Sequence, residues 1–253
     1  MASLNLASAL VPVTGAASGI GLAICRQLRL EGGTPLLLDF DRQRLDAALG
    51  EVFGTSVAEA QRFGYLVDVR DSKAVDACLA QIRQDHGLIT HAVANAGRSL
   101  AAHILDMTDE QWHGVMDVNL HGMLYFCRAA ARQLAEAKRG SLVTMASIAG
   151  LMAKESRVGY AASKAAVVNM TRALALDLGP FGVRVNAVAP GVIDTPLQTN
   201  PSYQEPVKQR AALRRVGNAD EIASVVLFLL SDMSSYMTGE TLVVDGGLTA
   251  RYL

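Results

Sequence analysis

The sequence predicts a single doubly wound α/β domain, in which a parallel sheet of about seven strands carries helices on both faces. Short runs that are apolar on both faces alternate with longer amphipathic stretches of helical period. The chain has 253 residues, of which 51% are hydrophobic, and it contains no repeat, low-complexity or linker-like stretch. We therefore expect residues 1–253 to form one domain around a large core.

The strands and helices of this domain can be placed in order along the chain. Pro12 lies inside the first strand, which should be central in the sheet, and a proline there predicts a bulge because it cannot donate a ladder hydrogen bond. Residues 225–230 read as a buried helix segment. The strands are predicted at 8–13, 34–38, 63–67, 89–94, 140–145, 182–189 and 241–245, and the clearest helices at 19–32, 72–87, 109–137 and 159–179.

Charge and composition exclude several classes of protein. The net charge is −1 with no basic stripe or tail, which argues against a nucleic-acid partner. The apolar N-terminus has no positive region before Arg26, so it is not a signal peptide, and no apolar run approaches the ~18 residues of a membrane helix. Three scattered cysteines read as reduced thiols. We expect a soluble cytoplasmic protein without a membrane partner.

Ligands of doubly wound sheets bind at the carboxyl ends of the strands, and the first such end carries a glycine-rich loop. The stretch "TGAASGIG", residues 14–21, follows the first strand and opens the first helix. Its glycines allow a tight turn and a close approach of phosphate to the backbone and the helix N-terminus. It lacks the Gly-Lys-Ser/Thr ending of nucleotide hydrolases. The loop predicts a dinucleotide site on a Rossmann domain, contacted by Gly15, Ser18, Gly19, Ile20 and Gly21.

The second strand ends at an acidic residue that bears on cofactor choice. Asp39 lies eighteen residues beyond Gly21, close to the spacing of an acid that binds a ribose 2′-hydroxyl. Its charge would repel the 2′-phosphate of NADP, and residues 14–21 contain no Arg or Lys to offset it. Asp39 could instead cap the next helix, but Asp41 could do that. We therefore predict NAD as the cofactor, with Phe40 beside the site.

The later strand ends supply further candidates, although each could be ordinary turn chemistry by itself. Residues 68–69 and 95–97 suit the floor and edge of an adenosine site. Ser147 is a polar side chain at the end of a strand, and residues 190–195 form a turn with backbone groups available to a ligand. Ser147 is not in a Gly-x-Ser-x-Gly elbow, which disfavours a serine hydrolase. The candidates are Asp68, Val69, Asn95, Ala96, Gly97, Ser147, Pro190, Gly191, Ile193 and Thr195.

Tyr160 and Lys164 lie four residues apart in a predicted helix and so share one face. Such a pair is common on solvated helix surfaces. An adjacent cation also favours the ionised form of a phenol, which could then exchange a proton with an alcohol or a carbonyl. The pair alone does not decide between these interpretations.

Together these residues resemble the short-chain dehydrogenase/reductase family over nearly the whole chain. The resemblance rests on "TGAASGIG", "NAG", Asn119, Ser147, the Tyr160-x-x-x-Lys164 motif and "TGETLVVDGG", in family order. It implies that Tyr160 is the general acid/base, that Lys164 lowers the phenol pKa and binds the nicotinamide ribose, and that Ser147 orients the substrate. Asn119 would hold a water of a proton relay.

The family also implies an assembly and a substrate lid. We expect a homotetramer, with the helices around 109–137 and 158–178 in one interface and the C-terminal strand region in another. Residues 195–215 should form the lid over a small alcohol or ketone. The departures from the family pattern are Pro12 and Ala94, where a second Asn often precedes "NAG".

Three functions remain open at this point. The leading one is an NAD-dependent oxidoreductase of a secondary alcohol, such as a sugar, polyol or hydroxyacyl compound, or its ketone. A 3-oxoacyl-(acyl carrier protein) reductase is opposed by Asp39, since those enzymes usually use NADPH, and by Phe181 where they tend to carry a basic residue. A silent nucleotide-binding regulator is disfavoured because the catalytic set is present. The five histidines lack metal-ligand spacing, so no metal is expected.

Overall fold

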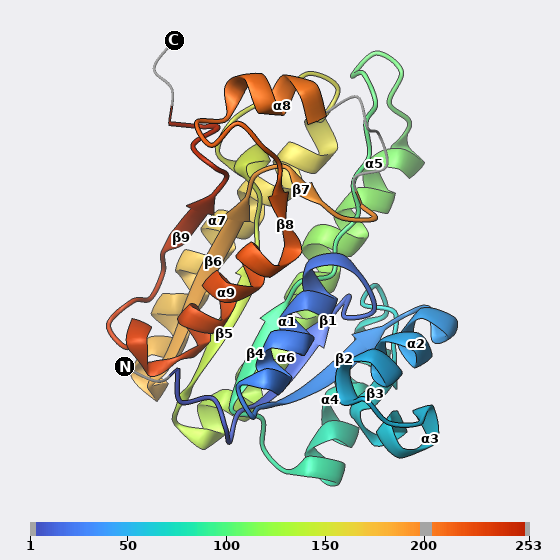
Figure 1. The fold of residues 1–253 in the computed structure, drawn as a ribbon, viewed down its shortest axis with the longest axis vertical. Coiled ribbons are helices and arrows are strands. Elements are labelled where there is room, and N and C mark those ends of the chain that lie inside the picture. The colour runs from blue at the N-terminus through green and yellow to red at the C-terminus, as the bar shows by residue number, and fades with distance from the viewer. Residues whose placement is uncertain (1–3, 198–203, 251–253) are drawn as a thin grey trace.

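The computed structural model describes residues 4–197 and 204–250, and it has a seven-stranded parallel sheet at its centre (Figure 1). The strand order is β3-β2-β1-β4-β5-β6-β9, which confirms the doubly wound fold and all seven predicted strands. The strands are β1 (Leu10–Thr14), β2 (Thr34–Asp39), β3 (Gly64–Leu66), β4 (His91–Ala94), β5 (Gly140–Met145), β6 (Val183–Pro190) and β9 (Thr241–Val244).

Helices connect the strands. The predicted helix over 109–137 is continuous but changes its winding, from α-helix to a π-helical segment at Asp117–Gly122 and back. The α-helices are α1 (Gly19–Leu30), α2 (Arg42–Phe53), α3 (Val57–Ala60), α4 (Ser72–His86), α5 (Asp109–Met116), α6 (Met123–Ala137), α7 (Val158–Leu178), α8 (Gln204–Arg210) and α9 (Ala219–Leu230).

Two hydrophobic cores cover the two faces of the sheet. Side chains alternate between faces along a strand, so Leu37 enters one core while Leu36 and Leu38 enter the other. The first core receives the buried faces of α1, α2 and α9, and the second those of α4, α6 and α7. The segment 225–230 lies in α9 as predicted. Strands buried on both sides explain the continuous apolar runs in the sequence.

Pro12 lies in β1, and no bulge interrupts the pairing of β1 with β2. The residues of β1 pair in unbroken register with β2, with Pro12 opposite Leu36. Leu10 bonds through both its amide and its carbonyl to Thr90, and Pro12, two residues further on, faces the same side. The nitrogen of Pro12 therefore faces β4. The pair recorded between β1 and β4 is Val13 opposite Val93. The missing donor therefore affects the side of β1 that faces β4 and not the pairing with β2.

The region after β6 contains a short ladder that the sequence did not indicate. β7 (Ile193–Asp194) pairs in parallel with β8 (Gly217–Asn218), and α8 lies between them in sequence. Leu213, after α8, donates its amide to the carbonyl of Gly246, which follows β9. These contacts place α8 at the end of the molecule where β6 and β9 terminate (Figure 1). Residues 198–203 of the expected lid lie outside the described residues.

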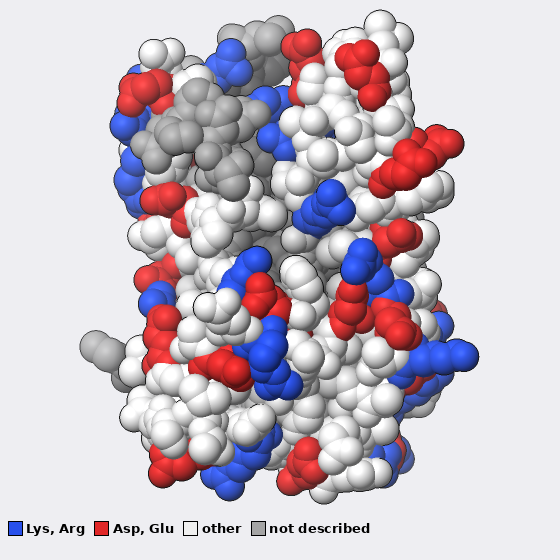
Figure 2. All heavy atoms as spheres, turned by 90° about the vertical axis from the view of Figure 1, so that its right-hand side faces the viewer, with Lys and Arg blue, Asp and Glu red and all other residues white. Residues whose placement is uncertain are grey.

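The surface and the helices add two findings. On the face drawn in Figure 2, Lys and Arg side chains lie among Asp and Glu side chains and form no patch of one sign. Among the helices of residues 4–197 and 204–250, none combines the length and the apolar character that crossing a membrane requires. Cys25 and Cys127 are buried free thiols, and Cys78 is a partly exposed one.

Candidate functional site

The glycine loop between β1 and α1 has the geometry that a pyrophosphate needs. Gly15 and Gly19 adopt φ values of 63° and 54°, in the left-handed region that favours glycine. A Cβ on Gly21 would overlap the carbonyl oxygen of Gly15, so the loop closes tightly on the helix. Ser18, the N-cap of α1, makes no side-chain cap, and the first turn contains no acidic residue. The first amides of α1 are therefore available to an anion.

Asp39 ends β2 directly beside this loop. Its carboxylate is only 8% exposed and accepts hydrogen bonds from the backbone amides of Ala17 (3.1 Å) and Asp41 (3.2 Å). Because a carboxylate has about four acceptor positions, it can still receive the hydroxyls of a ribose. Asp41 caps α2 by accepting a hydrogen bond from the amide of Arg44 at 3.0 Å. The helix cap that Asp39 could have supplied is therefore supplied by Asp41. Phe40 is exposed beside the site.

The segment after β4 is fixed to the glycine loop by its side chains. Asn95 donates from Nδ2 to the carbonyls of Thr14 (2.9 Å) and Gly15 (3.1 Å). The Thr14 hydroxyl accepts from the amides of Asn95 and Ala96, both at 3.0 Å. The side chain of Asn95 thus holds the loop in shape rather than projecting toward a ligand. Gly97 follows, and the space beside it is bordered by Lys164 Nζ.

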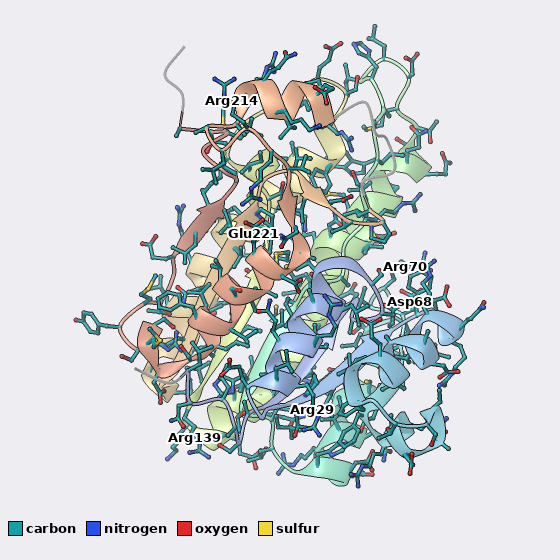
Figure 3. All side chains as sticks on the ribbon, viewed as in Figure 1. Arg29, Asp68, Arg70, Arg139, Arg214 and Glu221 are labelled. Atoms are coloured by element: carbon teal, nitrogen blue, oxygen red, sulfur yellow. The ribbon has the colours of Figure 1, made fainter. Side chains whose placement is uncertain are left out.

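Asp68, which was expected at the edge of an adenosine site, is paired with a neighbouring arginine. Its carboxylate is engaged by Arg70, whose Nη2 approaches it at 2.5 Å, and Figure 3 shows the two side chains together. This pairing holds the pKa of Asp68 below its usual range. Val69 packs on the π-helical segment, because the space that a Cβ on Gly122 would need is filled by Val69. The backbone at 68–69 remains at the edge of the site.

Tyr160 lies in the first turn of α7, close to the end of β5. Ser147 follows β5, and its hydroxyl hydrogen-bonds the phenol. Ser147 also accepts from the amide of Ala149 at 3.1 Å, which fixes its side chain. Gly150 lets this segment approach α7, since a Cβ there would come within 2.6 Å of the backbone of Lys164. The predicted Ser–Tyr–Lys set is thus brought together at one strand end.

The phenol of Tyr160 and the ammonium of Lys164 make different contacts. Burial raises the pKa of Tyr160, and the opposing influences are the hydrogen bond from Ser147 and the charge of Arg157. Lys164 Nζ lies 5.9 Å from the ring centroid and donates to the carbonyl of Met145 at 2.7 Å. The ammonium thus makes its hydrogen bond to the backbone of β5 while it lies over the ring of Tyr160.

Lys164 is 3% exposed, and burial lowers the pKa of its ammonium to about 8. The unfolded chain holds this proton up to its ordinary pKa, so between about pH 8 and pH 10.5 the unfolded state binds more protons. We therefore expect the wild-type free energy of unfolding to rise relative to that of Lys164→Met across this range, by about 3 kcal/mol. Denaturant titrations of both proteins at several pH values measure the difference, and a constant difference would refute it.

Asn119 lies in the π-helical segment and is fully buried. Its Oδ1 accepts from the amide of Arg98 at 2.7 Å, and its Nδ2 donates to the carbonyl of Arg98 (2.9 Å) and to Ser163 Oγ (3.1 Å). Ser163 in turn donates to the carbonyl of Tyr160 at 2.7 Å. The side chain therefore joins the segment after β4 to the turn of α7 that carries Tyr160. π-Helical turns are frequent at functional sites.

The end of β6 closes the other side of the site. Gly191 lies so close to Asp245 that a Cβ would come within 2.7 Å of its backbone, and its amide bonds Val244. Ile193 is buried in β7, and Thr195 lies against Gly19 of the glycine loop. Pro190, the last residue of β6, pairs with Val244. The turn after β6 is therefore partly strand, and it reaches back to the first helix.

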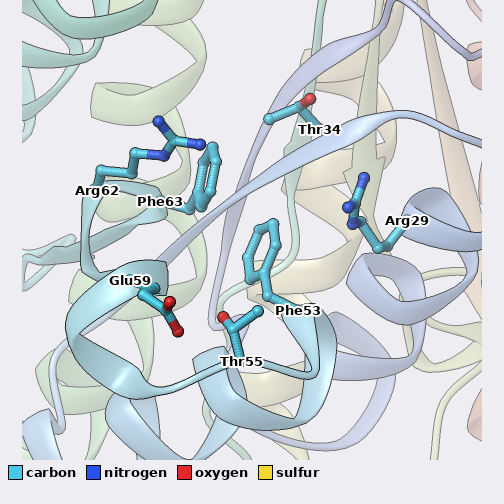
Figure 4. A pocket seen from close by; sticks show the side chains of 7 residues that line it. All are labelled: Arg29, Thr34, Phe53, Thr55, Glu59, Arg62 and Phe63. Atoms are coloured by element: carbon cyan, nitrogen blue, oxygen red, sulfur yellow. The ribbon is translucent and has the colours of Figure 1, made fainter.

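A separate hollow of about 390 Å³ lies away from these residues, at the amino end of β2 (Figure 4). The stacked rings of Phe53 and Phe63 are 4.4 Å apart at its wall, with Arg29 and Arg62 over their outer faces. None of the candidate site residues lines it. It is at the wrong end of the sheet for the predicted chemistry.

A family model described as enoyl-(acyl carrier protein) reductase matches residues 15–249. A 3-oxoacyl-(acyl-carrier-protein) reductase of Thermotoga maritima is 36% identical over 238 residues, covering 93% of this chain and 96% of its own. The chain belongs to the short-chain dehydrogenase/reductase family. Members of the family are oxidoreductases that use a nicotinamide cofactor, and this chain is therefore an enzyme acting on alcohol or ketone substrates.

Other members of the short-chain dehydrogenase/reductase family agree with this assignment. An NAD-dependent glycerol dehydrogenase of Listeria innocua is 32% identical over 250 residues, covering 98% of this chain and 96% of its own. The crystal structure of a short-chain type dehydrogenase/reductase from Mycobacterium marinum superposes with a TM-score of 0.90 at 31% identity, covering 98% of both chains.

Two residues near the site were missed by the sequence reasoning. Arg157 precedes α7 and influences Tyr160, and its Nη1 donates to Ser99 Oγ at 2.6 Å. The position of Arg157 three residues before Tyr160 was the available signal. Ser99 lies 58 residues away in sequence and had none.

Proposed function

We propose that this enzyme transfers a hydride between a secondary alcohol, or its ketone, and NAD, with Tyr160 as general acid/base. The observation that carries the proposal is the grouping of Ser147, Tyr160 and Lys164 where β5 ends. Gly97 lies beside Lys164, in the segment after β4 that is hydrogen-bonded to the glycine loop. Sugars, polyols and hydroxyacyl compounds are the substrate classes that we favour.

Each side chain has a distinct task in this proposal. The nicotinamide supplies the hydride acceptor or donor. In oxidation Tyr160 takes the hydroxyl proton of the alcohol, and in reduction it returns a proton to the carbonyl oxygen. Ser147, fixed by the amide of Ala149, orients the substrate oxygen. Lys164 binds the nicotinamide ribose, and Asn119 keeps the segment after β4 in register with α7 and takes part in the proton relay.

NAD is proposed over NADP because of Asp39. A buried carboxylate beside the glycine loop accepts a ribose 2′-hydroxyl but repels a 2′-phosphate. The name of the Listeria innocua relative states NAD dependence. The proposed cofactor contacts are Gly15, Ser18, Gly19, Ile20, Gly21, Asp39, Phe40, Asp68, Val69, Asn95, Ala96, Gly97, Tyr160, Lys164, Pro190, Gly191, Ile193 and Thr195, with the backbone acting at Asp68 and Asn95.

A 3-oxoacyl-(acyl carrier protein) reductase is the second candidate. The observation in its favour is the Thermotoga maritima relative of that name, which spans 93% of this chain. Such an enzyme would reduce a β-ketoacyl thioester with NADPH, which Asp39 opposes.

One assay separates these candidates. Purified protein is followed by nicotinamide absorbance with secondary alcohols, polyols, sugars and β-hydroxyacyl esters, and in reverse with an acetoacetyl thioester, using NAD(H) and NADP(H) in parallel. Oxidation of an alcohol with NAD is the expected result. Faster reduction of the thioester with NADPH would support the second candidate. Cofactor binding without any turnover would favour a catalytically silent nucleotide-binding regulator.

We also propose a cytoplasmic homotetramer with a substrate lid at 195–215. β9 is the last strand in the sheet order, and Val243 on it is exposed, which suits an interface at the C-terminal strand. Leu124 on α6 and Leu176 on α7 are exposed apolar side chains on the helices expected in the other interface. Light scattering of the purified protein tests the assembly.

A further inference from the structure

The hollow at the amino end of β2 is lined by two arginines. Arg29 lies in the last turn of α1, and Arg62 lies in the turn before β3. Each guanidinium lies over a phenylalanine ring, and neither forms an ion pair with a carboxylate of the described part of the chain. Arg26, one turn before Arg29, pairs by contrast with Glu51 and Asp220. The charges of Arg29 and Arg62 are therefore available to an anion.

Aromatic rings form one wall of this hollow (Figure 4). Phe53 ends α2 and Phe63 ends the turn before β3, and their rings stack with centroids 4.4 Å apart. His86, at the end of α4, stacks on Phe63 at 5.7 Å, and its Nε2 bonds the carbonyl of Arg62 at 3.0 Å. Contacts from three elements thus hold the wall in place, and it offers a flat apolar surface to a ligand.

One carboxylate also borders the hollow, and its own partners are already in place. Glu59 belongs to the capping box of α3, where it accepts from the amide of Ser56 at 3.1 Å and from its hydroxyl at 2.7 Å. Two guanidinium charges against this one carboxylate leave the lining with one net positive charge. Thr34 and Thr55 add two hydroxyls that can donate hydrogen bonds. The lining therefore suits a singly charged anion with a flat apolar body better than a dianionic phosphate.

We propose that this hollow binds an aromatic carboxylate, with its ring against the Phe53–Phe63 wall and its charge attracted by Arg29 and Arg62. Arginine suits both parts of such a ligand, because the planar guanidinium forms paired hydrogen bonds to a carboxylate and stacks on aromatic faces. The volume of about 390 Å³ lies within the range of small-molecule pockets.

The hollow is separate from the site that contains Tyr160. β2 runs from Thr34, which lines the hollow, to Asp39 beside the glycine loop, so the two sites are roughly 16 Å apart at about 3.3 Å per residue. Binding in the hollow requires neither the proposed cofactor nor the proposed reaction. We therefore expect the hollow to be occupied equally well whether the cofactor site is empty or filled.

The test measures binding of 2-naphthoate to the purified full chain by equilibrium dialysis. Arg29→Gln and Arg62→Gln should each raise the dissociation constant about 3- to 10-fold, because each removes a cation from a partly solvated site. Phe63→Leu should raise it as well by removing part of the ring wall. Arg29→Lys and Arg62→Lys should restore part of the affinity, since they keep the charge. Arg128→Gln is the matched control, because Arg128 also lies over a ring, that of Tyr125 at 5.5 Å, but does not line the hollow.

Two reference ligands separate the parts of the proposal. 2-Naphthalenemethanol has the ring without the charge and inorganic phosphate has the charge without the ring, so both should bind at least about 10-fold more weakly than 2-naphthoate. Saturating NADH should leave the dissociation constant of 2-naphthoate unchanged. Wild-type affinity in both Arg29→Gln and Arg62→Gln would overturn the proposal, as would phosphate binding as tightly as 2-naphthoate or displacement of 2-naphthoate by NADH.

Thermal unfolding of each variant separates a lost site from a lost fold. Arg29 and Arg62 are exposed, so their Gln variants should unfold within about 2 °C of wild type. A weaker dissociation constant at an unchanged unfolding temperature then reports on the hollow itself.

Discussion

Replacing Tyr160 by Phe should lower turnover by about 10²- to 10⁴-fold, the range that a positioned general acid or base contributes. The substitution removes one hydroxyl and leaves the ring in the first turn of α7. The proton of the alcohol then has no phenol to accept it. Ser147 lies next to this position, but its hydroxyl already accepts a hydrogen bond from the amide of Ala149. The glycine loop and Asp39 are not touched by the change. NADH affinity should therefore stay within about twofold of wild type.

Steady-state kinetics and fluorescence titration with NADH measure the two quantities on the same preparation. Tyr236→Phe is the matched control, because Tyr236 is fully exposed and the substitution removes the same hydroxyl from the surface. Its turnover should equal that of wild type. If Tyr160→Phe lost NADH binding and thermal stability together with turnover, Tyr160 would be a structural residue and the proposed chemistry would be wrong.

Much of the fold could be predicted because its signals are local. Runs that are apolar on both faces mark strands buried on both sides, and Leu36, Leu37 and Leu38 show why, since they enter opposite cores. The glycines of the loop after β1 were equally informative, because a left-handed φ and the close approach of Gly21 to Gly15 restrict those positions to glycine.

The parts that were missed depend on contacts between segments far apart in the sequence. Nothing local indicates that Arg157 meets Ser99, or that β7 pairs with β8 across α8. The Lys164 ammonium is held by the carbonyl of Met145, and the pattern of residue types along the sequence does not reveal such a contact. The effect of Pro12 could not be predicted for a related reason, since it depends on which neighbouring strand the proline nitrogen faces.

Asp39→Asn should lower the preference for NAD over NADP, expressed as the ratio of the two kcat/KM values, by about 10- to 100-fold. A hydrogen bond to a charged group contributes about 1.5–3 kcal/mol, and each 1.4 kcal/mol corresponds to a factor of ten. Asn has the shape of Asp but no charge, so it accepts a ribose hydroxyl less strongly and repels a 2′-phosphate less. Both effects move the ratio in the same direction.

The ratio is the proper measure because Asp39 also has a structural task. Its carboxylate accepts from the amides of Ala17 and Asp41, and the single carbonyl oxygen of Asn can satisfy these less well. The resulting loss of order in the glycine loop should affect both cofactors alike and cancel in the ratio. Asp41→Asn is the matched control, because it removes a carboxylate that caps α2 two residues away and should leave the ratio unchanged. A wild-type enzyme that already prefers NADP would show that the charge of Asp39 does not select the cofactor.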